Sequence, residues 1–315
     1  MKRTTDGRFI EERILLDKRS LKEILNSAKI KNNLTWKQLA SKLEINLQAV
    51  IHDWLIPNRT IASSKFNKLI KLADVDITKL DIKRTEPFWG QKLQIKEVTF
   101  PDKENPHFAE LYGVLLGDGC IFSDKKATSI TGDKIVDYFY YNNFLNNLIN
   151  NLFGFYPKIY TNKRERVIRC LIYSKKVAEY LNKCGFPIGV KYGSNPVIPG
   201  YIMANKEAVA SCIRGLMDTD GSLSSHPNSK IMIHLSITIK SLIDSVSQGL
   251  KMLEIKHGVY NKGIMIYTKE KVKDFYDKIG FSNFKNNYKY KEFLRTGKVP
   301  KKEQVETFII SKIKS

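Results

Sequence analysis

The sequence predicts an α+β fold with two pseudo-symmetric αββαββα repeats forming a β-saddle, preceded by a small all-α helix-turn-helix domain. The octet Leu111-Tyr-Gly-Val-Leu-Leu-Gly-Asp118, followed by Gly119, recurs 102 residues later (118 to 220) as Ile213-Arg-Gly-Leu-Met-Asp-Thr-Asp220 with Gly221. In the residues before the first octet, apolar positions recur only with the spacing of a helix. The expected segments are a basic arm (1–19), the helical domain (20–80), a linker (81–106), the repeats (107–203 and 204–298) and a basic tail (299–315).

The composition points to a polyanionic partner. The 315 residues include 53 Lys and Arg against 32 Asp and Glu, a formal charge of +21. Such an excess favours nucleic acid. An anionic membrane surface is the alternative, but it would require a basic amphipathic helix or a lipidation signal. We therefore expect double-stranded DNA as the partner, with no membrane and no obligatory protein partner.

No apolar stretch has the length of a signal peptide or a membrane span, which predicts a cytoplasmic protein. The four cysteines (Cys120, Cys170, Cys184, Cys212) and the five histidines show no metal-ligand spacing. They are expected to be reduced thiols and ordinary imidazoles, and a zinc-dependent nuclease is disfavoured.

Four amphipathic helices are expected in the first domain. Leu21, Ile24, Leu25 and Ala28 share one face, Thr35 is a plausible N-cap of the second helix, and Pro57 ends the third. Two helices joined by a turn of three to four residues resemble the helix-turn-helix of phage repressors. A helical packing domain without a DNA role is the alternative. The expected DNA contacts on this unit are Lys37, Gln48, His52 and Arg59.

The similarity between the two halves extends beyond the octets. Ile172-Tyr-Ser-Lys-Lys-Val177 resembles Ile266-Tyr-Thr-Lys-Glu-Lys-Val272, and Gly185-Phe186 matches Gly280-Phe281 in the same order. Three landmarks in one order indicate an internal repeat. The expected elements after each octet are strand pairs at about 120–132 and 222–239, helices at 134–153 and 240–254, strand pairs at 156–173 and 257–268, and helices at 175–184 and 269–279.

Strand pairs that alternate in polarity leave one face free of the core. For any single basic residue a solvated face is the simpler explanation, but their number across both halves favours a basic saddle on duplex DNA. The residues predicted on this face are Lys125, Lys126, Lys158, Tyr160, Asn162, Lys163, Arg164, Arg166, Arg169, Lys230 and Lys262.

The octets also have a physical interpretation. Gly113 and Gly215 lack side chains, so the two helices can pack closely at their crossing. Asp118 and Asp220 would then lie together at two helix C-termini, which is unfavourable unless a cation lies between them. A hard divalent ion is favoured, Mg²⁺ or else Mn²⁺, with the carbonyls of Gly117 and Thr219 as further ligands. For a single octet, Asp-Gly as a simple helix-ending turn is an equally good explanation.

The paired octets resemble those of LAGLIDADG homing endonucleases in their single-chain, two-repeat form. The second octet is the closer match, whereas Leu116 departs from the acid usual at the sixth position. The resemblance covers about residues 107–295. It implies metal-dependent hydrolysis of one phosphodiester in each DNA strand, with Asp118 and Asp220 as catalytic acids. It further implies a lysine near the end of each repeat, for which Lys191 and Lys289 are the candidates, although either is also explained as a surface lysine.

The predicted function is thus a site-specific, double-strand DNA endonuclease of the homing type, monomeric, acting on a long and partly palindromic target. No splicing block is found, so a free-standing or intron-encoded enzyme is expected. The alternatives are a non-cleaving DNA-binding regulator and an RNA splicing maturase on the same fold. Binding alone needs no paired acids, which argues against the regulator, and no aromatic RNA-binding motif supports the maturase.

Overall fold

The computed structural model describes residues 2–3, 9–10, 12–56, 60–77, 80–85, 98–162, 164–191 and 193–314. The chain forms two compact units, Met1–Glu97 and Val98–Ser315. Arg59 and Lys163, both predicted DNA contacts, lie outside the described residues. In the part of the chain described, no helix combines the length and apolar character needed to cross a bilayer.

The helices of the first unit begin where the sequence supplies capping side chains. Asp17, Thr35 and Asn46 each accept a hydrogen bond from a backbone N–H of the first turn that follows. Thr35 and Gln38 form a reciprocal capping box. The helices are α1 (Lys18–Lys31), α2 (Trp36–Lys42), α3 (Leu47–Ile51), the short η1 (Asp53–Leu55) and α4 (Ser63–Ala73). Their core includes Leu21, Leu25, Leu39, Leu43, Val50, Phe66 and Leu69.

The first unit is not all-α, which corrects the prediction. Strand β3 (Arg13–Leu15) pairs with β4 (Ile61–Ala62) on one side and β5 (Lys83–Thr85) on the other, and β1 (Lys2–Arg3) pairs with β2 (Phe9–Ile10). Residues 13–19 therefore belong to the folded unit, because Ile14 and Leu16 are buried in its core. Their apolar side chains were too few among charged neighbours to indicate a strand.

The second unit contains two successive sets of helix, two strands, helix, two strands and helix. The first set is α5 (Pro106–Asp118), β6 (Gly119–Ile121), β7 (Thr128–Asp133), the π-helical turn η3 (Tyr140–Leu145) continuing as α6 (Asn146–Phe153), β8 (Lys158–Thr161), β9 (Val167–Ile172) and α7 (Lys175–Lys183). After the short α8 (Gly200–Met203), the second is α9 (Lys206–Asp220), β10 (Gly221–Ser224), β11 (Met232–Ser236), α10 (Lys240–Met252), β12 (Gly258–Tyr260), β13 (Gly263–Tyr267) and α11 (Lys269–Lys278).

Each set forms a four-stranded antiparallel sheet, in the orders β6-β7-β9-β8 and β10-β11-β13-β12. In both orders the strand that follows the octet helix is an edge strand. Alternation along the strands buries one face, for example Ile168, Cys170 and Ile172 of β9, in a core that both halves share. The two sheets therefore have corresponding topologies, as the repeat predicts.

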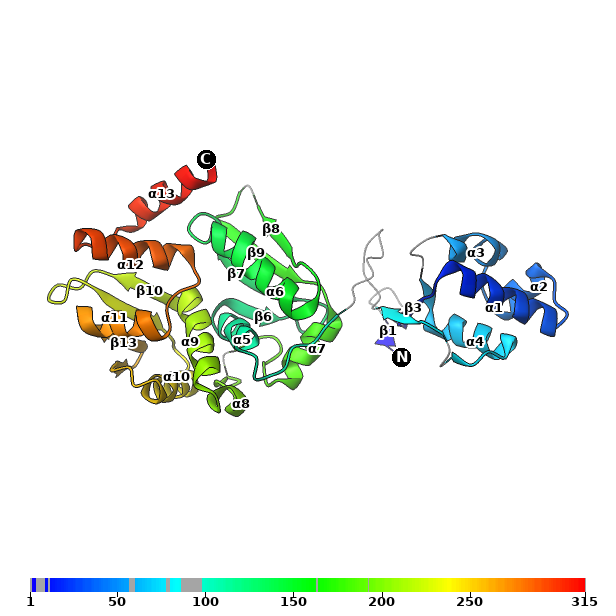
Figure 1. The fold of residues 1–315 in the computed structure, drawn as a ribbon, viewed down its shortest axis with the longest axis horizontal. Coiled ribbons are helices and arrows are strands. Elements are labelled where there is room, and N and C mark those ends of the chain that lie inside the picture. The colour runs from blue at the N-terminus through cyan, green and yellow to red at the C-terminus, as the bar shows by residue number, and fades with distance from the viewer. Residues whose placement is uncertain are drawn as a thin grey trace. The chain divides into compact units, whose positions relative to one another are not determined.

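Helices α5 and α9 lie side by side between the two sheets (Figure 1). Their backbones touch at the octet glycines. A Cβ placed on Gly113 would lie 1.9 Å from the carbonyl oxygen of Cys212, and one on Gly215 would lie 2.1 Å from that of Glu110. The carboxylate of Glu110 also accepts two hydrogen bonds from Arg214 at 2.6 and 2.9 Å, which bridges the helices.

The C-terminal segment, which includes the predicted basic tail, is helical. Helix α12 (Phe284–Thr296) is followed by α13 (Lys302–Lys314), which buries Val305 and Ile309. Phe308 of α13 stacks on Tyr288 of α12 with ring centroids 4.0 Å apart. Apolar residues spaced by three and four positions explain why this lysine-rich segment folds onto its neighbour.

The close helix packing generates a prediction. Gly113→Ala places a methyl group against backbone that cannot move away, so we expect destabilisation of about 1–3 kcal/mol or more. Thermal unfolding would measure it. Gly200→Ala is the matched control, because a Cβ there meets nothing within 4 Å. Equal melting temperatures for the two variants would contradict the close approach.

Candidate active site between helices α5 and α9

The two octet acids lie together at the ends of the central helices. Helix α5 ends at Asp118 and α9 ends at Asp220, each followed by a glycine that begins the next strand. A Cβ on Gly117 would lie 3.3 Å from Cγ of Asp220, so the ends of the two helices are in contact. Both acids are partly buried.

Burial and mutual repulsion disfavour the ionised forms of this pair. Burial, followed by the charges of Asp220 and Asp137, raises the pKa of Asp118 to about 7. Burial raises the pKa of Asp220 to about 6, while the charge of Lys191 opposes the shift. Two acids at two helix C-termini thus form a site that a cation would stabilise.

Lys191 reaches the acids from the loop that follows α7. Its Nζ donates hydrogen bonds to the carbonyl oxygens of Leu115 at 3.1 Å and Leu116 at 2.8 Å, and also to that of Gly117. Burial lowers the pKa of Lys191, and the charges of Asp220 and Asp118 counteract this effect. The lysine therefore caps the C-terminus of α5 and offsets the negative charge of the acid pair.

This contact bears on the predicted metal ligands. The Gly117 carbonyl accepts a hydrogen bond from Lys191, which occupies one of its two lone pairs, and its role as a metal ligand stays a prediction. The backbone carbonyl of Thr219 stays a predicted ligand. The hydroxyl of the same residue donates to the carbonyls of Gly215 and Leu216 within its own helix, at 3.2 and 2.9 Å. Its side chain also packs against Gly117, where a Cβ would lie 2.1 Å from Oγ1.

Lys289 does not lie where the sequence interpretation placed it. Its Nζ donates to the carbonyl of Leu223 on β10 at 3.0 Å, and its pKa is lowered by burial and then by the charges of Lys285 and Lys302, not shifted by either octet acid. Lys285 is the second-half lysine whose charge acts on Asp118. The number of residues from the octet acid pointed to Lys289 as the counterpart of Lys191. This count misleads because the two halves differ in length between the acid and the closing loop.

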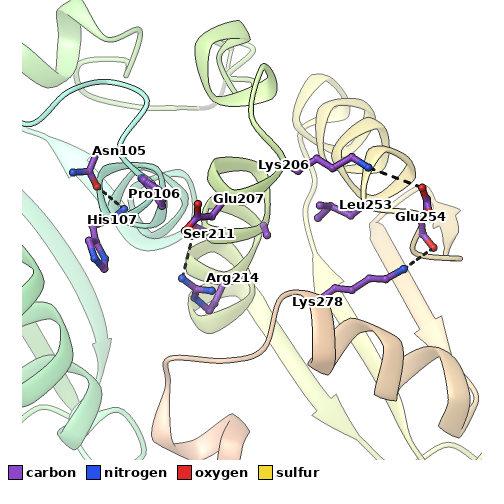
Figure 2. Close-up of a pocket in the computed structure, with 11 residues that line it drawn as sticks. Asn105, Pro106, His107, Lys206, Glu207, Ser211, Arg214, Leu253, Glu254 and Lys278 are labelled. Carbon is purple, nitrogen blue, oxygen red and sulfur yellow. Dashed lines mark hydrogen bonds and ion pairs between the residues drawn. The ribbon is translucent and has the colours of Figure 1, made fainter.

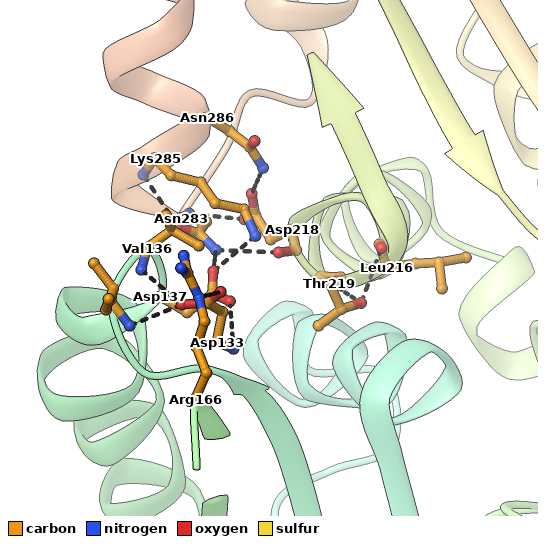
Figure 3. A network of polar contacts seen from close by, with 12 residues as sticks. Asp133, Val136, Asp137, Arg166, Leu216, Asp218, Thr219, Asn283, Lys285 and Asn286 are labelled. Atoms are coloured by element: carbon orange, nitrogen blue, oxygen red, sulfur yellow. Dashed lines mark hydrogen bonds and ion pairs between the residues drawn. The ribbon is translucent and has the colours of Figure 1, made fainter. Parts of the chain in front are cut away.

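Lys285 belongs to a buried polar network that joins the halves (Figure 3). Its Nζ lies 2.7 Å from Oδ1 of Asp137, which also accepts a hydrogen bond from Nδ2 of Asn283 at 2.8 Å. Asp218, fully buried in α9, accepts hydrogen bonds from the backbone N–H groups of Ser282 and Asn283 at 2.6 and 2.9 Å. The N-terminus of α12 is therefore anchored to both halves beside the acid pair.

The sequence did not predict this network. Its motifs mark Asp218 only as the sixth residue of the second octet, and they do not single out Asp137 or Asn283. A signal for Lys285 existed in the repeat itself: Lys191 follows Gly185 by six residues, and Lys285 follows Gly280 by five. Nothing in the sequence indicated that Asp137 would lie near these residues, because that contact joins positions 148 residues apart.

The acid pair suits a cation that takes its remaining ligands from elsewhere. Within the described residues, no group of three or more His, Cys, Asp or Glu side chains could hold a metal ion. Mg²⁺ is commonly held by one or two carboxylates while water and substrate phosphates complete its shell. The raised pKa values of Asp118 and Asp220 indicate that their surroundings lack the positive charge that such an ion would supply. The donor set therefore fits Mg²⁺ or Mn²⁺.

Most of the residues predicted on the basic face do not lie on strands. Strands β10 to β13 of the second sheet contain no Lys or Arg. In the first sheet, Lys158, Tyr160 and Arg169 lie on strands. Tyr160 and Arg169 are directly opposite each other on neighbouring strands. The others lie in connections between strands, which corrects their placement on the sheet: Lys125, Lys126, Asn162, Arg164, Arg166, Lys230 and Lys262.

Arg166 pairs with two acids in this structure, and its contact with DNA stays a prediction. Its Nε donates to Asp133 at 2.6 Å and its Nη2 pairs with Glu306 of α13. Lys126 pairs with Asp124 at 3.3 Å, and Arg169 lies 3.6 Å from Glu165. The three basic side chains are all exposed, and exposed ion pairs are weak enough for a phosphate to replace the acid.

A separate cleft of about 770 Å³ lies at the opposite, N-terminal ends of α5 and α9. Charges of both signs line it, and Figure 2 shows Lys206 and Lys278 both directed at Glu254. Neither octet acid lines this cleft. The acid pair, rather than the cleft, is the candidate site.

Comparison with known proteins identifies the second repeat. A family model described as LAGLIDADG-like domain matches residues 207–280, from the start of α9 to just beyond α11. No curated protein sequence matches the chain.

The solved structures that match this chain include homing endonucleases and a WhiA protein. The structure of I-DmoI in complex with DNA and Mn shares 16% identity, covers 57% of this chain and 99% of that chain, and has a TM-score of 0.40. Full-length DUF199/WhiA from Thermotoga maritima shares 16% identity over 69% of each chain, with a TM-score of 0.42. I-SmaMI bound to uncleaveable DNA shares 12% identity, with 63% and 89% covered and a TM-score of 0.38.

The raised pKa values predict a pH-dependent response to metal. Because the folded-state pKa values of Asp118 and Asp220 exceed the usual 3.8, the folded chain takes up protons as the pH falls through about 7 and 6. These two carboxyls therefore make the metal-free protein more stable at pH 5 than at pH 8. Protonated carboxyls do not bind metal, so Mn²⁺ should raise the melting temperature at pH 8 and have little effect at pH 5.

Thermal unfolding with and without Mn²⁺ at the two pH values measures this response. Asp118→Asn combined with Asp220→Asn should remove it, whereas Asp244→Asn, on the exposed side of α10, should not. A stabilisation by Mn²⁺ that is equally large at pH 5 would exclude the acid pair as its site.

Proposed function

We propose that this protein is a divalent-metal-dependent DNA endonuclease of the homing type that hydrolyses one phosphodiester in each strand of a duplex. The observation that carries the proposal is the meeting of Asp118 and Asp220, from equivalent positions of two repeats, at one partly buried point. Two strands of a duplex related by a local dyad match two acids related by a pseudo-dyad. Mg²⁺ or Mn²⁺ is the cofactor we propose.

The residues at this site would have different roles. Asp118 and Asp220 would hold the cation, which when bound lowers the pKa of a water and stabilises charge on the phosphate. Lys191 keeps the end of α5 in place through its three carbonyl contacts. Lys285 lies on the Asp118 side, paired with Asp137, and adds positive charge near that acid.

The duplex would be held mainly by charge. The formal charge of +21 supports phosphate contacts over a long target. Lys158, Tyr160 and Arg169, which lie on strands of the first sheet, would contact a groove, while the lysines between strands would contact phosphates. Because the strands of the second sheet carry no Lys or Arg, its face would read bases through hydroxyl and aromatic groups.

For the first unit we propose a helix-turn-helix that adds DNA contacts. Helices α2 and α3 are joined by four residues, 43–46, and pack through Leu39 and Val50. Lys37, Gln48 and His52 are exposed, as contact residues must be, and His52 lies 3.2 Å from Asp53. The arrangement of the helices and the exposure of these side chains support this role.

A non-cleaving DNA-binding regulator is the second candidate. The observation that favours it is the contact of Lys191 with the Gly117 carbonyl, which puts a positive charge beside the acid pair, where the proposed cation would bind. Against it, two partly buried acids beside each other reduce stability and serve no purpose in binding alone.

A cleavage assay separates the two candidates. Supercoiled plasmid carrying the uninterrupted form of the gene's own insertion site should be cut in the presence of Mg²⁺. Asp118→Asn and Asp220→Asn should each reduce the rate by about 100-fold or more, as the loss of a group that stabilises transition-state charge does. Asp244→Asn is the charge-matched control. Shifted bands without cleavage by the unmodified protein would favour the regulator.

The first unit generates its own prediction. Lys37→Ala should weaken binding to duplexes of every sequence about equally and reduce the salt dependence by about one unit of slope, because one phosphate contact is lost. Fluorescence anisotropy over a range of KCl concentrations measures both quantities. Lys22→Ala, an exposed lysine on α1, is the control. The same slope in both variants and the unmodified protein would rule out a phosphate contact by Lys37.

A further inference from the structure

A groove between the edge of the second sheet and the C-terminal helices has no role in the site described above. It comprises two adjoining cavities of about 990 and 380 Å³, which share Ser225, Val299, Pro300, Lys301 and Glu303 as lining residues. Edge strand β10 forms one wall, and α12, which runs beside β10 in Figure 1, forms the other together with the turn into α13. We call this pair of cavities the lysine groove, after the lysines that line it: Lys230, Lys289, Lys298, Lys301 and Lys302.

Positive charge predominates in the lysine groove. Against its five lysines stand two acids, Glu292 and Glu303. Glu292 is already paired with Arg295 at 2.5 Å. Within the described residues, no ion pair involves any of the five lysines, whereas the lysines of the cleft at the other ends of α5 and α9 are directed at Glu254. A groove lined mainly by charges of one sign, without acids to pair with them, favours a bound anion.

Lys289 is the least exposed of the five lysines. Its side chain is partly buried, whereas the other four are exposed. Its Nζ donates a hydrogen bond to the carbonyl oxygen of Leu223 on β10 at 3.0 Å. Burial lowers the pKa of Lys289, and the charges of Lys285 and Lys302 lower it further. A partly buried cation that has like charges as neighbours would be stabilised by an anion.

The first half of the unit shows that capping a sheet edge does not require a lysine. Leu223 is the third residue after Asp220, and its counterpart Ile121 is the third residue after Asp118; both lie on edge strands. The carbonyl oxygen of Ile121 accepts a hydrogen bond from the backbone N–H of Gly189 at 2.8 Å. A backbone donor is therefore sufficient at this position, and the charge of the lysine in the second half is available for another role.

Two elements lead from the acid pair to the lysine groove. Strand β10 begins directly after Asp220, so Leu223, which lines the groove, lies at most about 10 Å along the strand. Helix α12 begins beside the same acids, because Asn283, its N-cap, donates its backbone N–H to Asp218 at 2.9 Å. Lys289 follows about 9 Å further along this helix. Since each strand of a duplex rises 3.4 Å per nucleotide, 10 Å corresponds to about three base pairs.

We propose that the lysine groove binds backbone phosphates of the duplex, about three base pairs from the scissile phosphate on the side of the second half. The inference rests on the proposed function, because the acid pair marks the cleavage position. Lysine ammonium groups bind phosphates as point charges, so this contact holds the duplex in position without reading its sequence. The groove supplies the second half with cations that its strands lack.

The first experiment measures how duplex binding depends on salt, without metal. Lys298→Gln combined with Lys301→Gln should lower the slope of log affinity against log KCl by about two units, so that the loss of affinity between 50 and 200 mM is about 10-fold smaller. The matched control is Lys251→Gln combined with Lys256→Gln, two exposed lysines on either side of Glu254 in the opposite cleft. Equal slopes for the two double variants would overturn the proposal.

A single substitution in the same groove should have the opposite sign. Glu303→Gln removes an acid that lines both cavities, so duplex binding should strengthen by about 2- to 5-fold, the effect of one exposed charge. Glu270→Gln, at an exposed position of α11, should leave the affinity unchanged. Unchanged or weaker binding by Glu303→Gln would contradict a phosphate in the groove.

The last experiment follows Lys289 itself. With ¹⁵N-labelled lysine, and the resonance assigned through Lys289→Met, a duplex of any sequence should shift the Nζ signal of Lys289. If inorganic phosphate alone produces the whole shift, the groove binds free anions and the proposal fails. A shift with the duplex but no cleavage in Mg²⁺ would reject the proposed endonuclease and keep the groove. Cleavage without a shift would reject the groove and keep the endonuclease.

Discussion

The close approach of helices α5 and α9 is the constraint on which the rest of the second unit depends. Gly113 and Gly215 allow backbone to contact backbone, and no larger residue would fit at either position. Both helices end at the same point relative to this crossing, so the acids that end them must meet. The ion pair of Glu110 with Arg214 holds the crossing from the side. A helix pair separated by ordinary side chains, at 8–10 Å, would keep the acids apart.

The meeting of Asp118 and Asp220 at two helix C-termini has an electrostatic cost, which the surrounding residues only partly offset. Lys191 caps the end of α5 and its charge acts on both acids, yet the pKa values of Asp118 and Asp220 remain raised. A folded protein tolerates such a site at the expense of stability. The cost becomes useful once a cation binds, because preformed charge needs no rearrangement. The acid pair is therefore a preformed site that the proposed cation would stabilise.

The two halves are equivalent at the acids and unequal around them. Where the second octet has Asp218, which anchors the N-terminus of α12, the first has Leu116, buried in the core. The network of Asp137, Asn283 and Lys285 therefore lies on one side of the pseudo-dyad only. The sheets differ as well, because Lys and Arg occur on strands of the first alone.

The sequence by itself determined the order of elements, the pairing of the octets and the identity of the two acids. These are local properties: apolar spacing sets helices and strands, capping residues set their ends, and a repeated motif implies a repeated fold. The small sheet of the first unit escaped notice, since strands of two or three residues leave too short a pattern to recognise.

Only the tertiary structure decided which residues surround the acids. Lys285 rather than Lys289 acts on Asp118, and Arg166 is held by Glu306. Each of these relations depends on the angle and register at which distant segments meet. A difference of a few residues between the two repeats changes which side chain points inward, and no local pattern in the chain records that choice.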